Sequence, residues 1–181
     1  MLDAAGMLFA QRGVDAVALR DVAAAADVHL ALIGRYVGNR DALVLAVFDD
    51  LSDQLARDVL ERPLETQGFE ADTVMGRWSR ITSALLISGR HLVGRTGFNP
   101  VLAMAETLVD GYGLDPKAAR LRAAQIVAAA LGWRLFERYL VEAGELEDVS
   151  LETLRDEHVR SLRRLGATPW PSPSDPPARG H

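Results

Sequence analysis

The sequence predicts an all-α protein, in which a cluster of short helices precedes a bundle of longer ones. Apolar residues recur with the helical repeat over most of the 181-residue chain. No stretch alternates apolar and polar residues for long enough to form a convincing strand. Residue types that begin or end helices, such as Asp, Ser, Pro and Gly, stand between the periodic stretches. With 49% hydrophobic and 25% charged residues, the chain can bury a core as a globular protein.

Three short helices are expected at the start of the chain. The first ends at Gly13, the second covers 19–26 and the third covers 30–37. Their inward-facing residues, by helical spacing, are Leu2, Ala5, Leu8, Phe9, Leu19, Val22, Ala23, Ala26, Ile33 and Val37. We expect these residues to form one small shared core.

Longer helices follow, separated by proline and glycine. Asp41 opens a long helix that is stopped at Pro63, and a second long helix is expected over 71–88. The glycine-rich segment 89–100 is predicted to be mostly loop. Proline at position 100 then opens a shorter helix that ends around 111–113.

The last two helices have the clearest start signals. Asp115 followed by Pro116 is an N-cap residue with proline at the first helical position, and it opens the most apolar helix, 115–143. Ser150 caps the final helix, which we expect to end at Gly166.

Composition, residue spacing and net charge argue against several classes of function. The chain has no cysteine, which excludes disulfides, thiolate metal sites and cysteine nucleophiles. Its four histidines lack metal-ligand spacing, and no glycine-rich phosphate loop is present, so we expect no catalysis, cofactor or metal. The net charge of −5 argues against a general nucleic-acid coat protein. Without a membrane-spanning run or a secretory signal, the sequence predicts a cytoplasmic protein that does not bind membranes.

Two clusters of polar residues lack the arrangement of a catalytic site. Asp156, Glu157 and His158 are consecutive in a predicted helix, so they point to different faces and are expected to form a solvated surface. Ser88 and His91 lie near the irregular loop, without a recognisable arrangement of nucleophile and base.

Residues 13–43 carry the pattern of a helix-turn-helix. A short helix is followed by a tight turn at 26–29 and by a second short helix. Such a unit can place its second helix in the major groove of DNA while the first crosses the backbone.

The order of residues in this segment resembles the tetracycline-repressor (TetR) family of bacterial regulators. The matching positions are Gly13, Val22-Ala23, Ala26-Asp27-Val28-His29, Ile33, Tyr36-Val37 and Arg40-Asp41-Ala42-Leu43. The likeness is close over the first quarter of the chain and extends to the rest only as a plan of helices. It implies a homodimeric, ligand-responsive repressor that a small molecule releases from a double-stranded DNA operator.

The resemblance also implies which residues contact DNA. Tyr36 and Arg40 occupy positions that usually grip phosphates, and Arg20 is expected to do the same. Apolar side chains of the third helix can sense a thymine methyl group. The full expected set is Arg20, His29, Leu30, Ala31, Leu32, Arg35, Tyr36 and Arg40. The alternative is that Tyr36 and the leucines only pack the small core, which is the role we expect for Ile33 and Val37.

Several positions depart from the family pattern. Gly34 replaces a phosphate-binding tyrosine and costs about 1 kcal/mol of helix stability relative to alanine. Ala18 replaces the usual Ser/Thr cap, a loss of about 1 kcal/mol, Asp27 replaces the glycine of the turn, and His29 replaces a serine. Residues 1–48 carry four arginines against five aspartates, a net charge of −1.

These departures and this charge predict modest DNA affinity with a shallow salt dependence. They keep open an alternative function, in which the chain is a ligand-binding dimer of the same fold that has lost specific DNA binding and acts through protein contacts.

The resemblance implies a helix-turn-helix DNA-binding domain (1–48) and a ligand-binding and dimerisation domain (49–166). Composition predicts a proline-rich flexible tail over 167–181. The helices 115–143 and 150–166 stand where the family forms its dimer interface, although the apolar helix 115–143 could instead be only the core of one subunit.

The resemblance implies a ligand pocket inside the larger domain, between its long helices, and large or polar residues on otherwise apolar helix faces are the candidates for its lining. The expected lining residues are Trp78, Ile81, Thr82, Leu85, Phe98, Met104, Gln125 and Trp133. The aromatic members indicate an apolar or aromatic effector. The resemblance implies that the effector moves the helix 41–63 and thereby changes the separation of the two recognition helices.

Overall fold

The computed structural model describes residues 1–61 and 73–167. Within those ranges all regular secondary structure is helical, as predicted, and turns and loops connect the helices. The helices are α1 (Leu2–Arg12), α2 (Leu19–Ala25), α3 (Leu30–Tyr36), α4 (Arg40–Glu61), α5 (Val74–Ile87), α6 (Pro100–Tyr112), α7 (Pro116–Ala143) and α8 (Leu151–Ala167). Pro63, the expected stop of the fourth helix, and the expected tail from Thr168 onward lie outside the described residues.

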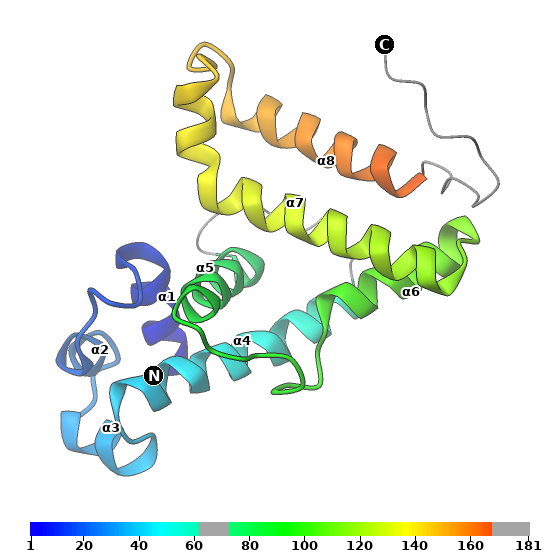
Figure 1. Ribbon diagram of the computed structural model, residues 1–181. Coiled ribbons are helices and arrows are strands. Elements are labelled where there is room, and N and C mark those ends of the chain that lie inside the picture. Colours follow the sequence, from blue (N-terminus) through cyan, green and yellow to red (C-terminus); the bar gives the residue numbers. More distant parts are fainter. Residues whose placement is uncertain (62–72, 168–181) are drawn as a thin grey trace.

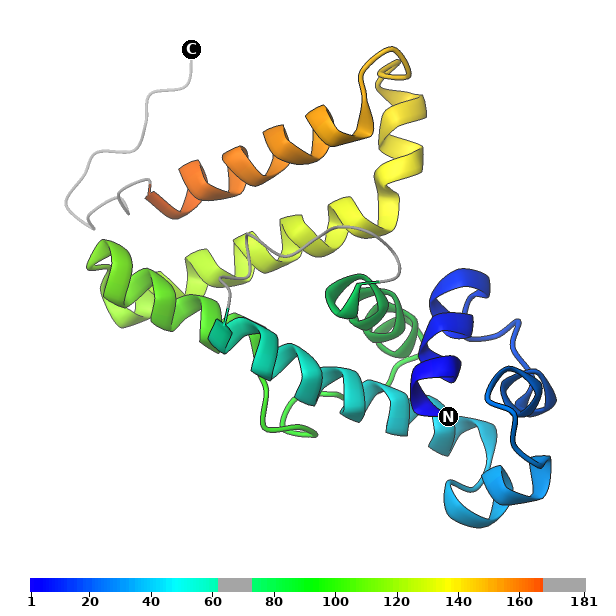
Figure 2. The ribbon, with the colours of Figure 1, turned by 180° about the vertical axis from the view of Figure 1, so that it is seen from behind.

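The short helices α1, α2 and α3 gather at one end of the molecule, and α4 runs from them toward α6 (Figures 1 and 2). Helix α5 lies between this part and α7, because it contacts α1, α4 and α7. Helices α6, α7 and α8 form the other end, where α7 packs against both of its neighbours. Helix α5 therefore packs against both ends of the molecule.

Two predicted helix starts are confirmed by their cap hydrogen bonds. The Asp115 carboxylate accepts hydrogen bonds from the backbone N–H groups of Lys117 at 3.0 Å and Ala118 at 3.2 Å. The Ser150 hydroxyl accepts one from the backbone N–H of Thr153 at 3.2 Å. These side chains satisfy donors that have no partner inside the helix.

Gly166 does not end α8, which continues through Ala167. The glycine is buried, and a Cβ placed on it would lie 3.3 Å from a methyl carbon of Leu108 and 3.7 Å from one of Ile126. Its small size therefore allows α8 to approach α6 and α7. The prediction of a helix end at Gly166 was wrong because the glycine serves packing between helices.

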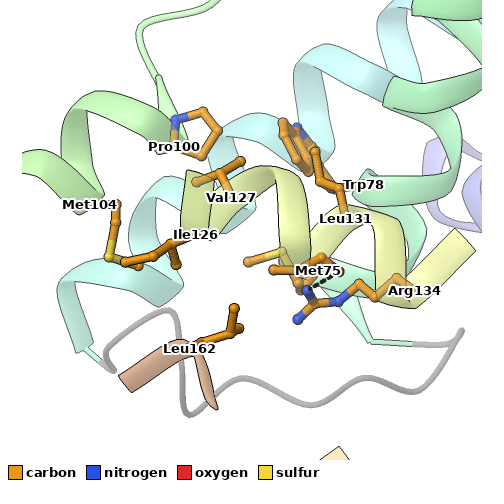
Figure 3. Close-up of a pocket in the computed structure, with 10 residues that line it drawn as sticks. Met75, Trp78, Pro100, Met104, Ile126, Val127, Leu131, Arg134 and Leu162 are labelled. Atoms are coloured by element: carbon orange, nitrogen blue, oxygen red, sulfur yellow. Dashed lines mark hydrogen bonds between the residues drawn. The ribbon is translucent and has the colours of Figure 1, made fainter. Parts of the chain in front are cut away.

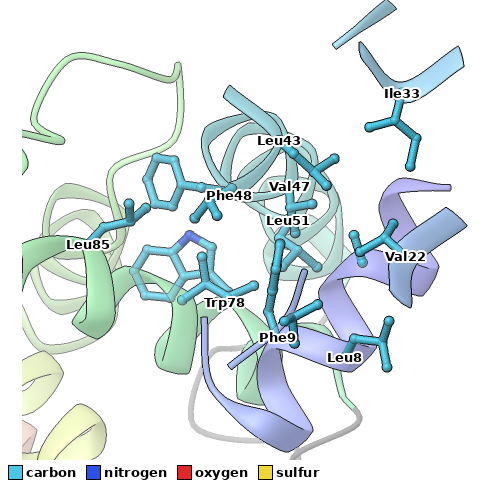
Figure 4. Packing of buried hydrophobic residues seen from close by; sticks show 14 of the residues in the cluster. Leu8, Phe9, Val22, Ile33, Leu43, Val47, Phe48, Leu51, Trp78 and Leu85 are labelled. Atoms are coloured by element: carbon cyan, nitrogen blue, oxygen red, sulfur yellow. The ribbon is translucent and has the colours of Figure 1, made fainter. Parts of the chain in front are cut away.

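One hydrophobic cluster connects the short helices to α4 and α5. Its buried members are Ala5, Leu8, Phe9, Val17, Val22, Ala23, Ile33, Leu43, Val44, Val47, Phe48, Leu51, Leu55, Met75, Trp78, Ile81 and Leu85 (Figure 4). The expected separate core of the first three helices is thus part of a larger one. Phe48 and Leu51 flank the predicted boundary between residues 48 and 49, and both belong to this cluster.

A second cluster lies between α6, α7 and α8. Its buried members are Met104, Ala105, Leu108, Ala119, Ala123, Ile126 and Leu162. Across the described ranges, every helix is too short or too polar to cross a membrane.

Candidate DNA interface and ligand pocket

The turn between α2 and α3 has the geometry of a tight helix-turn-helix. Asp27 adopts a left-handed conformation with φ of 51°, which aspartate tolerates better than most residues. The backbone N–H of Val28 donates to the carbonyl of Ala23 at 3.0 Å and closes the turn. Asp27 thus occupies the position of the family glycine without preventing the turn.

Helix α3 has one buried face and one exposed face. Ile33 is completely buried and Val37 is half-buried, as predicted for core residues. Tyr36 is 73% exposed, and Leu30 and Leu32 are exposed as well. The alternative in which Tyr36 and the leucines only pack the core is therefore wrong. His29, Ala31 and Arg35 share their exposure, so six of the predicted DNA-contacting residues are available on this helix and its N-cap.

Arg40 has a structural role that sequence reasoning missed. Its guanidinium donates hydrogen bonds to the backbone carbonyls of Val14 and, at 3.2 Å, Val17, and it pairs with Asp15 at 3.2 Å. Arg40 therefore fastens the loop before α2 to the start of α4. A phosphate contact by Arg40 would compete with these hydrogen bonds.

The departures from the family pattern have different structural consequences. At Ala18 half of the capping arrangement remains, because the Asp21 carboxylate accepts a hydrogen bond from the Ala18 backbone N–H at 2.9 Å. Nothing lies within 4 Å of a Cβ placed on Gly34, which is exposed. Arg20 has a side chain that is 84% exposed, with its Nε 3.9 Å from Asp21. The surface beside α3 therefore offers Arg20 and has open space at position 34.

A mostly apolar pocket lies between α5, α6, α7 and α8 (Figure 3). It is lined by Met75, Trp78, Pro100, Met104, Ile126, Val127, Ala130, Leu131, Arg134 and Leu162. The cavity measures about 40 Å³, room for only a few water-sized groups. A ligand of ordinary size therefore requires the surrounding helices or side chains to move.

Of the lining residues predicted from sequence, the structure places Trp78 and Met104 in this pocket. Ile81, Thr82 and Leu85 are buried elsewhere on α5, and Ile81 and Leu85 belong to the cluster shared with α4. Phe98 is not a lining residue of this pocket. It packs edge-to-face against Trp78, with the two ring centres 6.5 Å apart at an interplanar angle of 77°.

The last two predicted lining residues lie away from the pocket. Gln125 is on an exposed face of α7. Trp133 stacks on His158 of α8, with ring centroids 4.9 Å apart.

Sequence reasoning missed most of the α7 wall of the pocket. Ile126, Ala130 and Arg134 recur at intervals of four, as Val127 and Leu131 do, so both series lie on neighbouring rows of one helix face. The helical repeat could have grouped these residues. It could not show that this face, and not the one carrying Gln125, is covered.

His158 belongs to an interhelical cluster and not to a solvated surface. It is half-buried against Trp133, and burial lowers its pKa below the ordinary value of 6.5, with the positive charge of Arg134 lowering it further. Beside it, Arg155 donates two hydrogen bonds of 2.8 Å to Glu137, and these hold the pKa of that carboxyl below its usual value. The predicted solvation of His158 was wrong because Trp133 from α7 covers it.

A helix-turn-helix with an exposed second helix, joined to a larger helical part that contains an apolar pocket, defines a transcriptional regulator of the helix-turn-helix class. Residues 1–47 match the family described as "Bacterial regulatory proteins, tetR family". The HTH-type transcriptional repressor Rv3405c of Mycobacterium tuberculosis is 33% identical over 165 residues, which cover 86% of this chain and 81% of that protein. The chain belongs to the TetR family of transcriptional regulators.

One further relative and one solved structure are also similar to this chain. The HTH-type transcriptional regulator Mb3439c of Mycobacterium bovis is also 33% identical over 165 residues, with 86% of this chain and 81% of that protein covered. A crystal structure of a TetR-family regulator from Streptomyces coelicolor A3 is 22% identical and covers 92% of both chains with a TM-score of 0.41.

Proposed function

We propose that this protein is a homodimeric repressor that binds its operator through α3 and is released when a small molecule occupies the pocket between α5, α6, α7 and α8. One observation carries the proposal. Trp78, which lines the pocket, donates a hydrogen bond to Ser52 and stacks on Phe48. Both partners are on α4, the helix that follows the DNA-reading unit α1–α3. The proposed DNA-binding part is 1–48, and the proposed sensing and pairing part is 49–166.

The exposed side of α3 supports the DNA-binding role. Leu30, Ala31 and Leu32 offer apolar surface to base edges, while Arg35 and Tyr36 offer donors to phosphates. The guanidinium carbon of Arg35 lies 5.7 Å from the centre of the Tyr36 ring, so the two side chains lie next to each other. We assign to Arg20 and His29 further contacts beside this helix, and to Arg40 a phosphate contact for which its guanidinium would exchange part of its bonding to the loop.

Exposed apolar side chains on α7 and α8 support dimerisation through these helices. Phe136 is 56% exposed, Tyr139 is 67% exposed and Leu140 is 38% exposed, all on the C-terminal half of α7. Leu151 at the start of α8 is 47% exposed. Exposed aromatic and aliphatic side chains that lie close together are typical of protein interfaces. A two-fold pair would also present two copies of α3 to successive major grooves.

A path of contacts from the pocket to the DNA-reading unit supports release by a ligand. The lining residues of the pocket come from α5, α6, α7 and α8, so a ligand would act on α4 through α5. Trp78 of α5 bonds to Ser52 of α4 and stacks on Phe48 with ring centroids 6.4 Å apart. Helix α5 also holds α1, because Arg77 pairs with Asp3 and Arg80 donates to the carbonyl of Ala10 at 2.8 Å.

Widening the pocket would therefore displace α5 and the two helices it holds. Release then requires that the ligand binds the widened state more tightly than the closed one.

The test is binding of the purified protein to the DNA upstream of its own gene, measured by fluorescence anisotropy. Saturable binding that unrelated DNA of the same length does not match, and that a compound from a small-molecule collection weakens, is expected. Equal affinity for both DNAs would overturn the repressor assignment and favour the alternative of a dimer that acts through protein contacts. Specific binding that no pocket ligand weakens would overturn the release mechanism alone.

A further inference from the structure

The segment between α5 and α6 is tied to α4 by two ion pairs. The Arg95 guanidinium donates hydrogen bonds of 2.8 and 2.7 Å to the two carboxylate oxygens of Asp49. Arg90 donates to the carboxylate of Asp41, in the first turn of α4. Figures 1 and 2 both show this segment, residues 88–99, beside α4. We call it the strap, because it is fastened to one helix at two points.

Apolar contacts reinforce the ion pairs of the strap. Leu92 and Phe98 are partly buried and pack against the hydrophobic cluster that α4 and α5 share with the short helices. Isolated surface ion pairs contribute little to stability, unless an arginine binds both oxygens of one carboxylate or several charges act together. The Arg95–Asp49 pair is of the first kind, and its side chains are only 35% and 38% exposed. The strap is therefore held firmly against α4.

One end of the strap lies at the wall of the pocket. Asn99 caps α6 with its side-chain oxygen, and Pro100, the first residue of α6, lines the pocket. Phe98, just before them, packs edge-to-face against Trp78, which lines the same pocket. A guest that moves this wall outward therefore also moves the end of the strap.

The contact of Arg90 lies beside the DNA-reading unit. Its partner Asp41 directly follows Arg40, whose guanidinium fastens the loop before α2. Trp78, in contrast, donates its hydrogen bond to α4 further along the helix, at Ser52. The strap is therefore a second connection from the pocket to α4, and it reaches the start of that helix.

We propose that the strap is a regulatory element that holds α4 in its DNA-binding position while the pocket is closed and lets it go when the pocket widens. Both ion pairs are formed while the cavity measures about 40 Å³. Outward movement of Pro100 draws the strap along α4. Because the hydrogen bonds between guanidinium and carboxylate are short and directional, a small displacement breaks them. This inference rests on the proposed function, because it names the element through which the sensing pocket regulates operator binding.

The experiment removes the ion pairs of the strap and follows the opening of α4. Arg90→Gln combined with Arg95→Gln cuts both pairs and leaves the side chains of α4 unchanged. Backbone hydrogen exchange of the full-length protein is measured by mass spectrometry, because exchange within a helix reports how readily that helix opens. We expect the first half of α4 to exchange about two- to fivefold faster, the ratio typical of the loss of such ion pairs.

A substitution in the pocket tests the connection to the strap. Ala130→Leu places a larger side chain in the cavity and takes the place of a ligand. It is expected to speed exchange in the strap and in the first half of α4. Added to the double arginine variant, it should change the exchange of α4 little further, because the strap is already released. Val127→Phe, at another lining position, repeats the test.

Two further variants separate the ion pair from other effects of the substitutions. Arg138→Gln is the matched control, because it breaks an ion pair with Glu142 inside α7, and it should leave the exchange of α4 unchanged. Arg95→Asp combined with Asp49→Arg exchanges the two charges and should restore slow exchange. A role of either side chain alone would not predict this recovery.

Operator binding is measured separately, by fluorescence anisotropy. Asp49→Asn should weaken it about two- to fivefold, although the substitution removes a negative charge that repels DNA. Specific operator binding that Asp49→Asn leaves unchanged or tightens overturns the strap and leaves the repressor assignment standing. Exchange that changes as expected in a protein without specific operator binding supports the strap and overturns the repressor assignment.

The inference also fails if the double arginine variant exchanges like the unchanged protein, if the exchanged charges do not restore slow exchange, or if Ala130→Leu speeds the exchange of α4 equally with and without the ion pairs. Thermal unfolding of each variant establishes that it is folded. Where a pocket variant is unfolded, the double arginine variant and the charge exchange decide.

Discussion

Trp78 donates its indole N–H to the hydroxyl of Ser52, with 2.9 Å between nitrogen and oxygen, across the interface of α5 and α4. Ser52 in turn donates to the carbonyl of Phe48 at 2.8 Å, so its hydroxyl is both donor and acceptor in a buried site. The same indole ring lines the pocket. A movement of this ring on the pocket side would therefore disturb its contacts with Ser52 and Phe48 of α4.

Replacing Ser52→Ala is expected to weaken the connection between the pocket and α4. The buried indole N–H loses its acceptor, which should lower the free energy of unfolding by about 1–3 kcal/mol. Operator affinity without ligand should change little, while the release caused by a pocket ligand should diminish. Denaturant unfolding and operator titrations measure the two effects. Ser83→Ala is the control, because this buried hydroxyl donates only within its own helix, to the carbonyl of Ser79. Equal loss of release in both variants would contradict the assigned path.

Gly34 offers a test of the departures on α3. Since a Cβ meets nothing within 4 Å there, Gly34→Ala should raise the free energy of unfolding by about 0.5–1 kcal/mol. Gly34→Tyr should tighten operator binding by adding a phosphate donor. Gly38→Ala should instead destabilise, because φ at Gly38 is 102°, a conformation that alanine adopts only with strain. A stabilising Gly38→Ala would contradict the strain expected at that position, and a weaker-binding Gly34→Tyr would show that α3 meets DNA in another way.

Operator affinity should depend only modestly on salt. Residues 1–48 carry a net charge of −1, so few phosphates are neutralised and the slope of log K against log salt concentration should be shallow. Arg35→Ala should reduce that slope by about 1, as expected for the loss of one phosphate contact. Arg138→Ala, far along α7, should leave it unchanged. Titrations at several salt concentrations measure the slope, and a value typical of strongly basic repressors would refute the prediction.

The stability of the α7–α8 packing should fall in mild acid. The folded chain lowers the pKa of His158 below 6.5, so the unfolded chain binds more protons in the range just below that value. Stability is therefore complete above pH 6.5 and is lost as the pH falls from there toward the lowered folded pKa. Denaturant unfolding at about pH 7.5 and about pH 5.5 measures the loss. His158→Gln should reduce it, whereas His91→Gln, at an exposed position, should not.

The proposed dimer interface can be disrupted by one charge. Tyr139→Asp places a carboxylate in the exposed apolar surface of α7 and should convert dimers to monomers. Operator affinity should then fall more than about tenfold, because each half-site alone is bound weakly. Analytical ultracentrifugation measures the mass. Leu86→Asp on α5 is the control, since Leu86 is 52% exposed but lies outside this surface. A protein that is monomeric before any substitution would refute the interface directly.

Sequence alone determined the features whose causes are local. Asp115 and Pro116 mark the start of α7, Gly13 ends α1, and Asp27 accepts the left-handed turn before α3. Each depends on a few neighbouring residues, through a cap hydrogen bond or an allowed backbone angle. The same local order predicted the helix Leu30–Tyr36 and indicated the family.

Only the tertiary structure decided which helix faces are covered and what the long side chains reach. Gln125 and Ile126 are adjacent in sequence, yet one is exposed and the other lines the pocket. Arg40 bonds to a carbonyl 26 residues away, and Trp133 covers a histidine from another helix. Helical periodicity gives a set of faces, but burial is a property of the element packed against each face, and that element comes from distant parts of the chain.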